Sequence, residues 1–198
     1  MKYEDHKEYI LIRHGQTDYN LQEKFQGVSD ISLNAKGRKQ AKKIRKKFKE
    51  ENVDIIYCSD LIRCQQTAET VSPGNRIMLN KNLREMHFGV FEGLTYDEIK
   101  EHHADEYKKW KQDILDHVIE QGESFNQMNN RVIAEFENIR KNNEKAAVVS
   151  HAGCIRTILA HYLTGDIENS WRFFIENCSI TKLCFNRDYA YLKSLNLR

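Results

Sequence analysis

Two histidines, each close to a glycine, follow short apolar segments that lie far apart in the sequence. The first occurs in Arg13-His14-Gly15 and the second in Ser150-His151-Ala152-Gly153, and a third apolar segment ends in Ser59-Asp60-Leu61-Ile62-Arg63. A neutral imidazole can attack phosphorus, and the planar fork of an arginine guanidinium matches phosphate oxygens. Two histidines and two arginines that converge are therefore typical of phosphoryl-group chemistry.

Such a site also needs an acid for the leaving oxygen. Glu85, within Leu83-Arg84-Glu85, is the strongest carboxyl candidate from its position. Nearby guanidinium groups would lower the pKa of a histidine and keep it unprotonated. Each residue alone has a structural alternative: the histidines could only satisfy local hydrogen bonds, Arg63 could form an ion pair at a helix start, and Glu85 could be a surface charge. Their combination favours a functional site.

These residues need a scaffold that brings distant segments together. The apolar runs 9–12, 53–58 and 146–150 predict buried strands, and the runs 179–185 and 189–195 predict two closing strands. Helical patterns follow the first three runs, and Asn34 is placed to cap the first helix. Strand and helix in alternation predict a three-layer α/β/α fold with a mostly parallel sheet. The carboxyl ends of its strands would line one edge, where ligands bind.

The middle of the chain departs from this alternation. Residues 94–121 are polar and helical in pattern, and we expect them to form a short helical lid that lies over the site, within a single domain spanning 1–198. Ser124 and Gln127 fit a capping box that begins the next helix.

The charge balance excludes binding of nucleic acid through bulk charge. The chain has 31 Lys+Arg against 29 Asp+Glu, a formal net charge of only +2. The basic stretch 36–47 keeps Ala41 and Ile44 at helical spacing, with Phe48 after it, and no aromatic residues interleave its cations. It is predicted to be the solvated face of an amphipathic helix, and we expect no nucleic-acid partner.

Two features bear on localisation. The stretch Met1-Lys2-Tyr3-Glu4-Asp5-His6-Lys7 is charged, and no window approaches 18 uninterrupted apolar residues, so neither a secretory signal nor a membrane partner is predicted. The cysteines are odd in number and lie mostly in apolar stretches, which is typical of reduced thiols in the cytoplasm; they are Cys58, Cys64, Cys154, Cys178 and Cys184.

Motifs along the chain resemble the histidine phosphatase superfamily, the phosphoglycerate-mutase-like family. They are Leu11-Ile12-Arg13-His14-Gly15-Gln16-Thr17-Asp18-Tyr19-Asn20, Phe25-Gln26-Gly27, Leu33-Asn34-Ala35-Lys36-Gly37, Ser59-Asp60-Leu61-Ile62-Arg63-Cys64-Gln65-Gln66-Thr67-Ala68, Leu83-Arg84-Glu85, Phe88-Gly89-Val90-Phe91-Glu92-Gly93, Gly122-Glu123-Ser124, Val149-Ser150-His151-Ala152-Gly153 and Asn177-Cys178-Ser179. Because the resemblance covers nearly the whole chain in order, it is far more specific than the Arg-His-Gly triplet alone.

The resemblance implies a role for each residue of the candidate site. His14 would be the nucleophile that becomes phosphorylated, and Glu85 would be the proton donor. The residues that would bind the transferring phosphoryl group are Arg13, Arg63 and His151. Further positions that match phosphate or substrate contacts are Asn20, Gln26 and Gly27. The resemblance implies a small phosphomonoester as substrate, with no metal and no organic cofactor.

Other phosphate chemistries fit the sequence less well. A cysteine-dependent phosphatase has an arginine six positions after its cysteine, whereas Arg63 follows Cys58 by five and no histidine precedes that cysteine. A metallohydrolase needs clustered histidine and carboxylate ligands. The histidines of the lid have no matching acidic pattern and are predicted to be surface residues; they are His102, His103 and His117. No P-loop pattern occurs.

Within the family, the choice lies between a mutase and a phosphatase. A mutase must protect its phosphohistidine from water, and the glycolytic mutases that this chain resembles are longer, with an extra insertion over the site. The short lid is similar to that of the compact phosphatase branch, which includes α-ribazole phosphatases and broad-specificity phosphatases. We expect hydrolysis, with mutase-type transfer or a catalytically silent binding protein as alternatives. The physiological substrate and the oligomeric state stay open.

Overall fold

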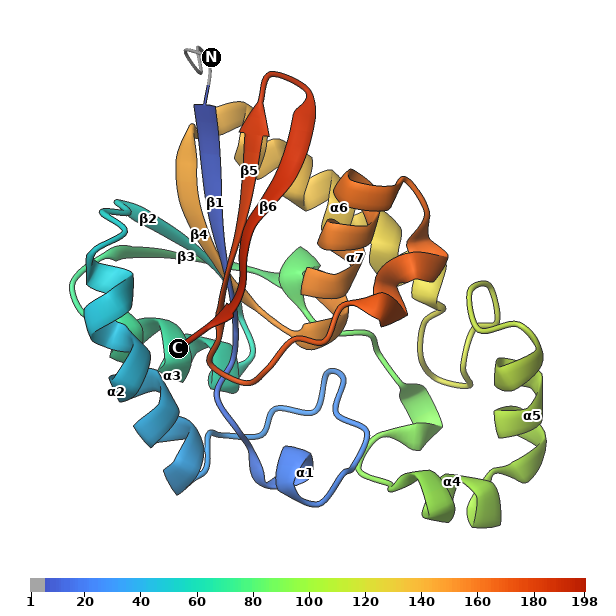
Figure 1. Cartoon of the computed structure of the whole chain (residues 1–198). Coiled ribbons are helices and arrows are strands. Elements are labelled where there is room, and N and C mark those ends of the chain that lie inside the picture. The colour runs from blue at the N-terminus through green and yellow to red at the C-terminus, as the bar shows by residue number, and fades with distance from the viewer. Residues whose placement is uncertain (1–5) are drawn as a thin grey trace.

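The computed structural model describes residues 6–198, and a six-stranded sheet lies at its centre (Figure 1). The strands lie in the order β3-β2-β4-β1-β5-β6. β3, β2, β4 and β1 run parallel, whereas β5 is antiparallel to β1 and β6 is antiparallel to β5. The prediction of a mostly parallel sheet with two closing strands is confirmed. The strands are β1 (His6–Arg13), β2 (Ile55–Ser59), β3 (Arg76–Asn80), β4 (Lys145–Ser150), β5 (Ile180–Asn186) and β6 (Tyr189–Leu197).

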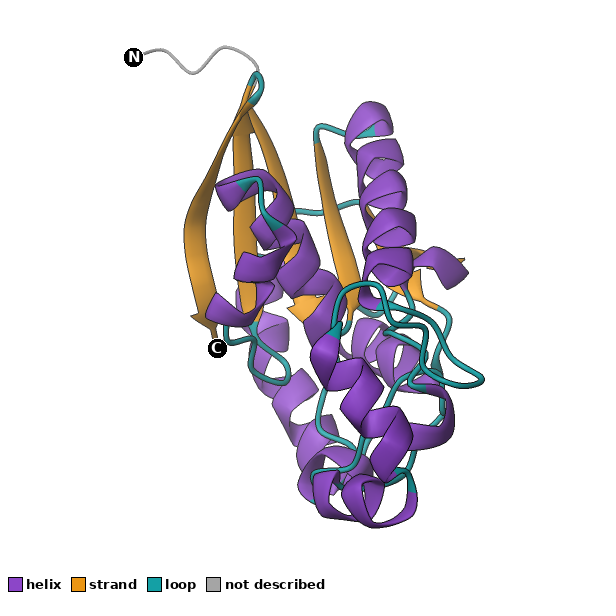
Figure 2. Cartoon of the chain, turned by 90° about the vertical axis from the view of Figure 1, so that its right-hand side faces the viewer, coloured by secondary structure: helices purple, strands orange, loops and turns teal. Residues whose placement is uncertain are grey.

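Helices cover both faces of the sheet (Figure 2). Tyr9 and Leu11 of β1 pack in one core with α6 and α7, whereas the alternating Ile10 and Ile12 pack in another core with α2 and α3. A strand that is buried on both faces needs a continuous apolar run, which is what the sequence shows. The three-layer α/β/α prediction is confirmed. The helices of the two layers are α2 (Ala35–Lys49) with α3 (Ile62–Val71), and α6 (Phe125–Asn142) with α7 (Ala152–Thr164).

The strand β3 was not predicted from the sequence. It lies at the edge of the sheet, and its Met78 and Leu79 are 38% and 53% exposed. Because its apolar run, 77–79, has only three residues and its polar and apolar residues do not alternate, the pattern that identifies strands is too short here.

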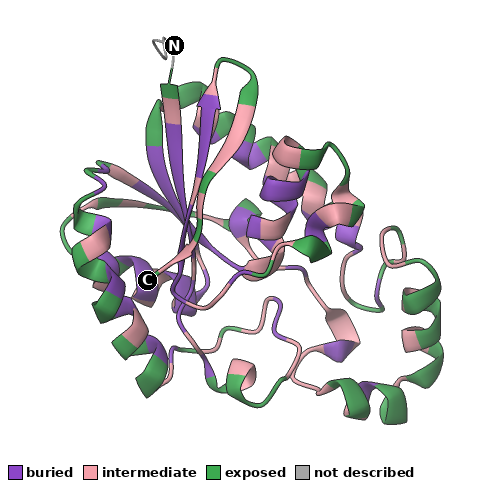
Figure 3. Ribbon diagram, viewed as in Figure 1, coloured by how far each residue is buried: buried purple, intermediate pink, exposed green. Residues whose placement is uncertain are grey.

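The basic stretch 36–47 lies in α2, as predicted. The side chain of Asn34 caps this helix by accepting from the backbone N–H of Gly37 at 2.9 Å. Ala41, Ile44 and Phe48 are buried against the sheet, and most of the cationic side chains are exposed (Figure 3). The cations therefore form the solvated face of an amphipathic helix.

The excursion 94–121 is helical only in its first part. It contains α4 (Tyr96–His102) and α5 (Ala104–Gln112), and the remainder up to 121 has no helix (Figure 1). The predicted capping box of Ser124 and Gln127 then begins α6. Short helical turns complete the chain: α1 (Asp18–Leu21), η1 (Lys81–Leu83), η2 (Gly89–Phe91) and η3 (Ile167–Arg172).

The predicted localisation depends on the absence of a membrane-spanning segment, on the charged stretch 1–7 and on the state of the cysteines. Across residues 6–198, no helix combines the length and the apolar character needed to cross a membrane. Most of the charged amino-terminal stretch 1–7 lies outside the described residues. All five cysteines are free and buried, as their apolar surroundings predicted.

Candidate active site

Three polar motifs meet because β2, β4 and β1 are neighbours in the sheet. Arg13 at the end of β1 lies in register with Ser150 at the end of β4, and the backbone N–H of His14 donates to the carbonyl oxygen of Ser150 at 3.0 Å. Parallel strands direct their carboxyl ends to the same edge, so Ser59, His14 and His151 leave the sheet there together. The sequence-based placement of these motifs is confirmed.

The environment of His14 fixes its protonation state. The residue is only 4% exposed, and its Nδ1 lies 2.8 Å from the carbonyl oxygen of Gly15. Because a carbonyl oxygen can only accept, Nδ1 carries the proton and Nε2 has a free lone pair in the neutral ring. Burial, followed by the charges of Arg63 and Arg13, lowers the pKa of His14 well below its usual value and outweighs the bond to Gly15. His14 is therefore a neutral imidazole with a nucleophilic Nε2.

His151 lies beside His14 and is completely buried. The centroids of the two rings are 5.1 Å apart and the ring planes are inclined by 60°. The Nε2 of His151 lies 2.9 Å from the Oγ of Ser59. Burial lowers the pKa of His151 well below its usual value, and the charge of Arg63 adds to this effect. A group bound at His14 is thus also next to a second neutral imidazole.

Two guanidinium groups lie at the same edge and are held by backbone carbonyl oxygens. Arg63, in the first turn of α3, is completely buried and donates to Ser29 at 2.8 Å and to Gly27 at 2.6 Å. Arg13 donates to Ile175 at 2.7 Å. Burial lowers the pKa of both groups, that of Arg13 to about 10, so both stay charged at neutral pH. Their positive charge is available to an anion.

Three buried N–H donors in this region have no hydrogen-bond partner within residues 6–198: Nε of Arg13, Nε of Arg63 and Nε2 of Gln26. Burying a donor without an acceptor is costly, and more so for a charged group. A phosphoryl group offers several acceptor oxygens together with negative charge. The donor set therefore fits an oxyanion of this kind.

The loop after β1 brings the remaining phosphate-contact candidates to this region. The amide oxygen of Gln26 accepts from the Oγ1 of Thr17 at 2.7 Å, and Thr17 also caps α1 in a capping box with Asn20. A Cβ on Gly27 would lie 2.0 Å from the carbonyl oxygen of Met86, so no larger residue fits there without movement. The side-chain amide of Asn20 donates to the amide oxygen of Gln26 at 3.4 Å, and the next residue, Gly27, supplies one of the carbonyl oxygens that hold Arg63.

Two residues of this region were not predicted for the site. Asn177 donates from its side chain to the carbonyl oxygen of His14 at 3.1 Å and to the side-chain oxygen of Asn20 at 3.2 Å. Ser59 contacts His151, as described above. The motif Asn177-Cys178-Ser179 was the available signal for Asn177, but a polar residue in an irregular loop carries no periodic pattern that would show what it contacts.

Glu85 lies on the loop between η1 and η2. Its carboxylate accepts from the backbone N–H of Gly153 at 2.9 Å and from that of Met86 at 3.1 Å. A Cβ at position 153 would lie 2.2 Å from the Oε1 of Glu85, so the glycine lets the carboxylate reach the first turn of α7. Glu85 is thereby held by its own neighbour in the chain and by Gly153, two residues after His151.

A cavity of about 100 Å³ opens beside Glu85, and its lining is mostly apolar. Trp110 of α5 and Ile114 just after it line this cavity, so part of the excursion 94–121 lies beside Glu85. Trp110 is fixed by edge-to-face packing against Phe25 and Phe91, with ring centroids 6.1 and 5.9 Å away. Further apolar lining comes from Phe88, Phe125, Met128 and Trp171.

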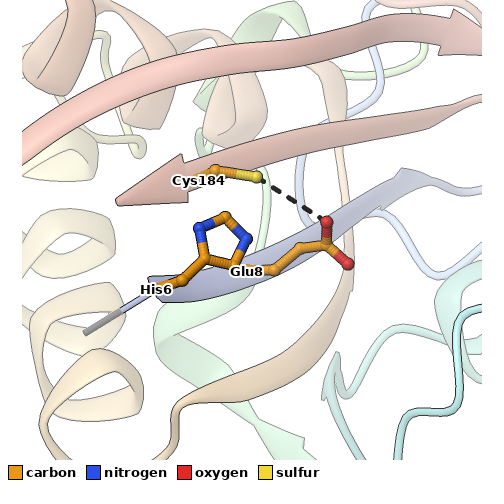
Figure 4. Close-up of side chains that lie close together, drawn as sticks. All are labelled: His6, Glu8 and Cys184. Carbon is orange, nitrogen blue, oxygen red and sulfur yellow. Dashed lines mark hydrogen bonds between the residues drawn. The ribbon is translucent and has the colours of Figure 1, made fainter. Parts of the chain in front are cut away.

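One cluster within residues 6–198 has the donor types of a metal site, namely His6, Glu8 and Cys184, whose ligand atoms lie within 4.8 Å of one another (Figure 4). Glu8 is already paired with Lys193 at 2.7 Å and with Lys145 at 3.4 Å. Burial raises the pKa of the Cys184 thiol to about 11, and this thiol donates to Glu8. The cluster lies near the start of β1, at the opposite end of that strand from His14, and is an ion-paired network outside the candidate active site.

The histidines of the lid are not equivalent. His102 is exposed, as predicted, whereas His103 and His117 are only partly exposed, which corrects the prediction of surface positions. The ring of His103 packs against Phe91, and the Nε2 of His117 lies 2.8 Å from the carboxylate of Glu106. The sequence could not show this, because one contact depends on how the lid packs against η2 and the other on how the lid folds back on itself.

The assembled groups have complementary chemical capacities. The Nε2 of His14 can act as a nucleophile, and the guanidinium groups can stabilise negative charge on phosphoryl oxygens. The carboxyl group of Glu85 can exchange a proton with an oxygen that enters or leaves. The apolar cavity beside Glu85 can accept the organic part of a ligand.

Comparisons with known proteins show the family to which this chain belongs. Residues 9–198 match the model of the histidine phosphatase superfamily (branch 1). Phosphoserine phosphatase 1 of Hydrogenobacter thermophilus is 28% identical over 192 residues, which cover 95% of this chain and 91% of that protein. Phosphoglycerate mutase-like protein 4 of Arabidopsis thaliana is 32% identical over 161 residues, which cover 78% of this chain and 70% of that protein. The crystal structure of the α-ribazole phosphatase from Shigella flexneri matches with a TM-score of 0.89 at 27% identity, over 96% of each chain. The chain therefore belongs to branch 1 of the histidine phosphatase superfamily.

Proposed function

We propose that this protein is a phosphomonoester hydrolase that acts on a small phosphorylated metabolite through a phosphohistidine intermediate. The observation that carries the proposal is the state of His14, whose Nδ1 is tied to the carbonyl oxygen of Gly15 while its pKa is lowered beside two guanidinium groups. Relatives named phosphoserine phosphatase and α-ribazole phosphatase support hydrolysis of small phosphate esters. Residues 1–198 would form one domain, with 94–121 as its lid.

In the first step, Arg13, Arg63 and His151 hold the phosphoryl oxygens. The lone pair on the Nε2 of His14 forms a bond to phosphorus while the bond between phosphorus and the ester oxygen breaks. The ester oxygen keeps the electron pair of the broken bond and takes a proton from the carboxyl group of Glu85, so the product leaves as a neutral alcohol. The positive charge of the two arginines opposes the negative charge on the phosphoryl oxygens throughout.

In the second step, water attacks the phosphohistidine. The carboxylate of Glu85 accepts a proton from this water as the new bond between oxygen and phosphorus forms. The bond between phosphorus and the Nε2 of His14 breaks, and its electron pair returns to the nitrogen. Inorganic phosphate leaves, and both His14 and Glu85 regain their starting protonation states.

The size of the lid supports hydrolysis over transfer back to an organic acceptor. The helices α4 and α5 have only seven and nine residues. A mutase has to keep water away from its phosphohistidine, which calls for a more extensive cover. Because the relatives carry names of both kinds, the partition between water and organic acceptors has to be measured.

We also propose that the reaction needs no metal ion and takes place in the cytoplasm. Arg13 and Arg63 already supply the positive charge that a metal ion would otherwise bring to the phosphoryl oxygens. The five free, buried cysteines support a reducing compartment.

The test is a panel of phosphomonoesters assayed for released inorganic phosphate in the presence of excess chelator, alongside an assay for interconversion of phosphoglycerates. We expect hydrolysis that is insensitive to the chelator and much faster than any interconversion. Loss of activity with the chelator would refute metal independence, and faster interconversion would establish a mutase. No turnover of any ester would point to a silent binding protein.

A further inference from the structure

Arg156 is a charged residue that the proposed mechanism does not use. It lies on α7 and lines the same apolar cavity as Glu85, Ala152 and Gly153. Its Nε donates to the carbonyl oxygen of Phe173 at 2.9 Å, and its guanidinium carbon lies 5.9 Å from the ring centroid of Trp171. These contacts fix one edge of the guanidinium and leave the two Nη atoms without a hydrogen-bond partner within residues 6–198.

The position of Arg156 relative to Glu85 follows from the helix. Residues 152, 153 and 156 share one face of α7, because positions three and four apart are neighbours on a helix. Gly153 holds the carboxylate of Glu85 through its N–H, so Arg156 lies about one turn further along the cavity than the proposed proton donor. A ligand whose ester oxygen lies at Glu85 would extend its next few atoms towards Arg156.

The surroundings of Arg156 make an additional anion the fitting partner. No carboxylate forms a salt bridge with this guanidinium among the described residues, and the lining of the cavity is otherwise mostly apolar. Burial lowers its pKa, and the nearby charge of Glu85 raises it. An unpaired charge beside apolar walls is costly, and the fork of an arginine matches a carboxylate with two parallel hydrogen bonds.

We propose that Arg156 binds a carboxylate of the substrate, so that the preferred substrates are phosphomonoesters of small hydroxy acids. This inference rests on the proposed function for the placement of the ester oxygen at Glu85. The phosphoryl group would lie at His14, the ester oxygen at Glu85, and the carboxylate at the free edge of the guanidinium. The apolar side chains would contact only the short carbon chain between them.

The test compares 3-phosphooxypropanoate with its neutral isostere 3-phosphooxypropanamide. The wild-type protein should have a kcat/KM ratio of about 10- to 100-fold in favour of the carboxylate, the range expected for a hydrogen-bonded charge pair. The Arg156→Gln variant should lower this ratio to near one, and Arg156→Lys should retain part of it. Arg172→Gln, which removes an exposed cation from the neighbouring η3, should keep the wild-type ratio. Because a ratio does not depend on the fraction of folded protein, reduced stability of a variant does not confuse the result.

The same pair of ligands should be measured by equilibrium binding to the non-nucleophilic His14→Asn variant, with and without Arg156→Gln. A preference for the carboxylate in binding that depends on Arg156, together with no hydrolysis of either ligand by the wild-type protein, would uphold this inference and refute the proposed function. Hydrolysis of both ligands by the wild-type protein without such a preference would support the proposed function and overturn the inference about Arg156. Equal losses for both ligands in Arg156→Gln would assign Arg156 a structural role and overturn the inference. A larger Arg156-dependent preference for propane-1,3-diol bisphosphate would keep the anion-binding role and assign it to a second phosphate.

Discussion

The two ends of the candidate active site are built from different parts of the fold. The phosphoryl end consists of Arg13, His14, Arg63 and His151, which lie at the ends of strands or at the start of the helix that follows one. Backbone carbonyl oxygens contact Arg13, His14 and Arg63, and the hydroxyl of Ser59 contacts His151. The leaving-group end is the apolar cavity beside Glu85, which is lined by side chains from the lid, α6, α7 and η3. Under the proposed function, the residues that perform the reaction and the residues that select the substrate would belong to different parts of the fold. Substitutions at the first end should abolish turnover, whereas those at the second should redistribute it among substrates.

The largest effect is expected at the phosphoryl end. Asparagine in place of His14 can still donate a hydrogen bond to the carbonyl oxygen of Gly15, but it has no nucleophilic nitrogen. We expect His14→Asn to lower kcat by at least about 10⁴-fold on every ester, because the covalent step is lost. Steady-state release of phosphate measures this. Residual activity within tenfold of wild type would show that His14 is not the nucleophile.

Glu85 is the proposed proton donor and also lines the apolar cavity. The loss of activity on its substitution should therefore depend on the leaving group. Glu85→Gln keeps an oxygen that can accept from the N–H of Gly153 but loses the transferable proton. Alkyl phosphates should lose about 10²- to 10⁴-fold in kcat, the range of general acid catalysis. 4-Nitrophenyl phosphate should lose much less, because its leaving group departs without protonation. Equal losses for both classes would contradict the role of Glu85 as the acid.

At the leaving-group end, the expected change concerns selectivity. Trp110→Ala removes an apolar wall of the cavity and should reduce the kcat/KM advantage of bulky apolar esters over methyl phosphate by about tenfold. Tyr96→Phe provides the control, because Tyr96 is an exposed residue of α4 on the same lid. If Trp110→Ala instead slowed all esters equally, this wall of the cavity would act on the reaction itself and not on the choice of substrate.

The smallest effect is on stability, and it has a defined direction with pH. His14 and His151 stay neutral in the folded protein, where their pKa values are lowered, but they take up protons in the unfolded chain below about pH 6.5. The free energy of unfolding should therefore be at its plateau above that pH and fall as the pH is lowered towards 5. The slope should be up to about 1.4 kcal/mol per pH unit for each histidine.

Urea denaturation across this pH window measures the slope. His14→Asn should remove one of the two contributions, whereas His102→Asn, at an exposed position on α4, should leave the slope as in the wild type. A wild-type stability that does not change between pH 5 and 6.5 would contradict the neutral, buried state of the two imidazoles.

The residues at the strand ends could be predicted from the sequence, whereas most of the side chains that line the cavity could not. His14, Arg63 and His151 were predictable because parallel strands place the residues that follow them at one edge. Arg156 was not predictable, because a single arginine on a helix gives no signal that its guanidinium lines a cavity. The helical part of the lid was expected, but His103 and His117 are partly buried by contacts with η2 and within the lid that no periodic pattern encodes. The edge strand β3 was missed for the related reason that its half-solvated residues have no regular alternation.

Covalent catalysis by His14 is tested most directly by the position of the phosphate that is trapped on the protein. The protein should be mixed rapidly with a phosphomonoester, quenched in base and examined by peptide mass spectrometry and phosphorus NMR. We predict a base-stable, acid-labile phosphate on His14, bonded at Nε2, because Nδ1 carries the proton that is donated to Gly15. Phosphate on Nδ1 or on another residue, or turnover with no covalent phosphate under conditions that accumulate the intermediate, would contradict the account.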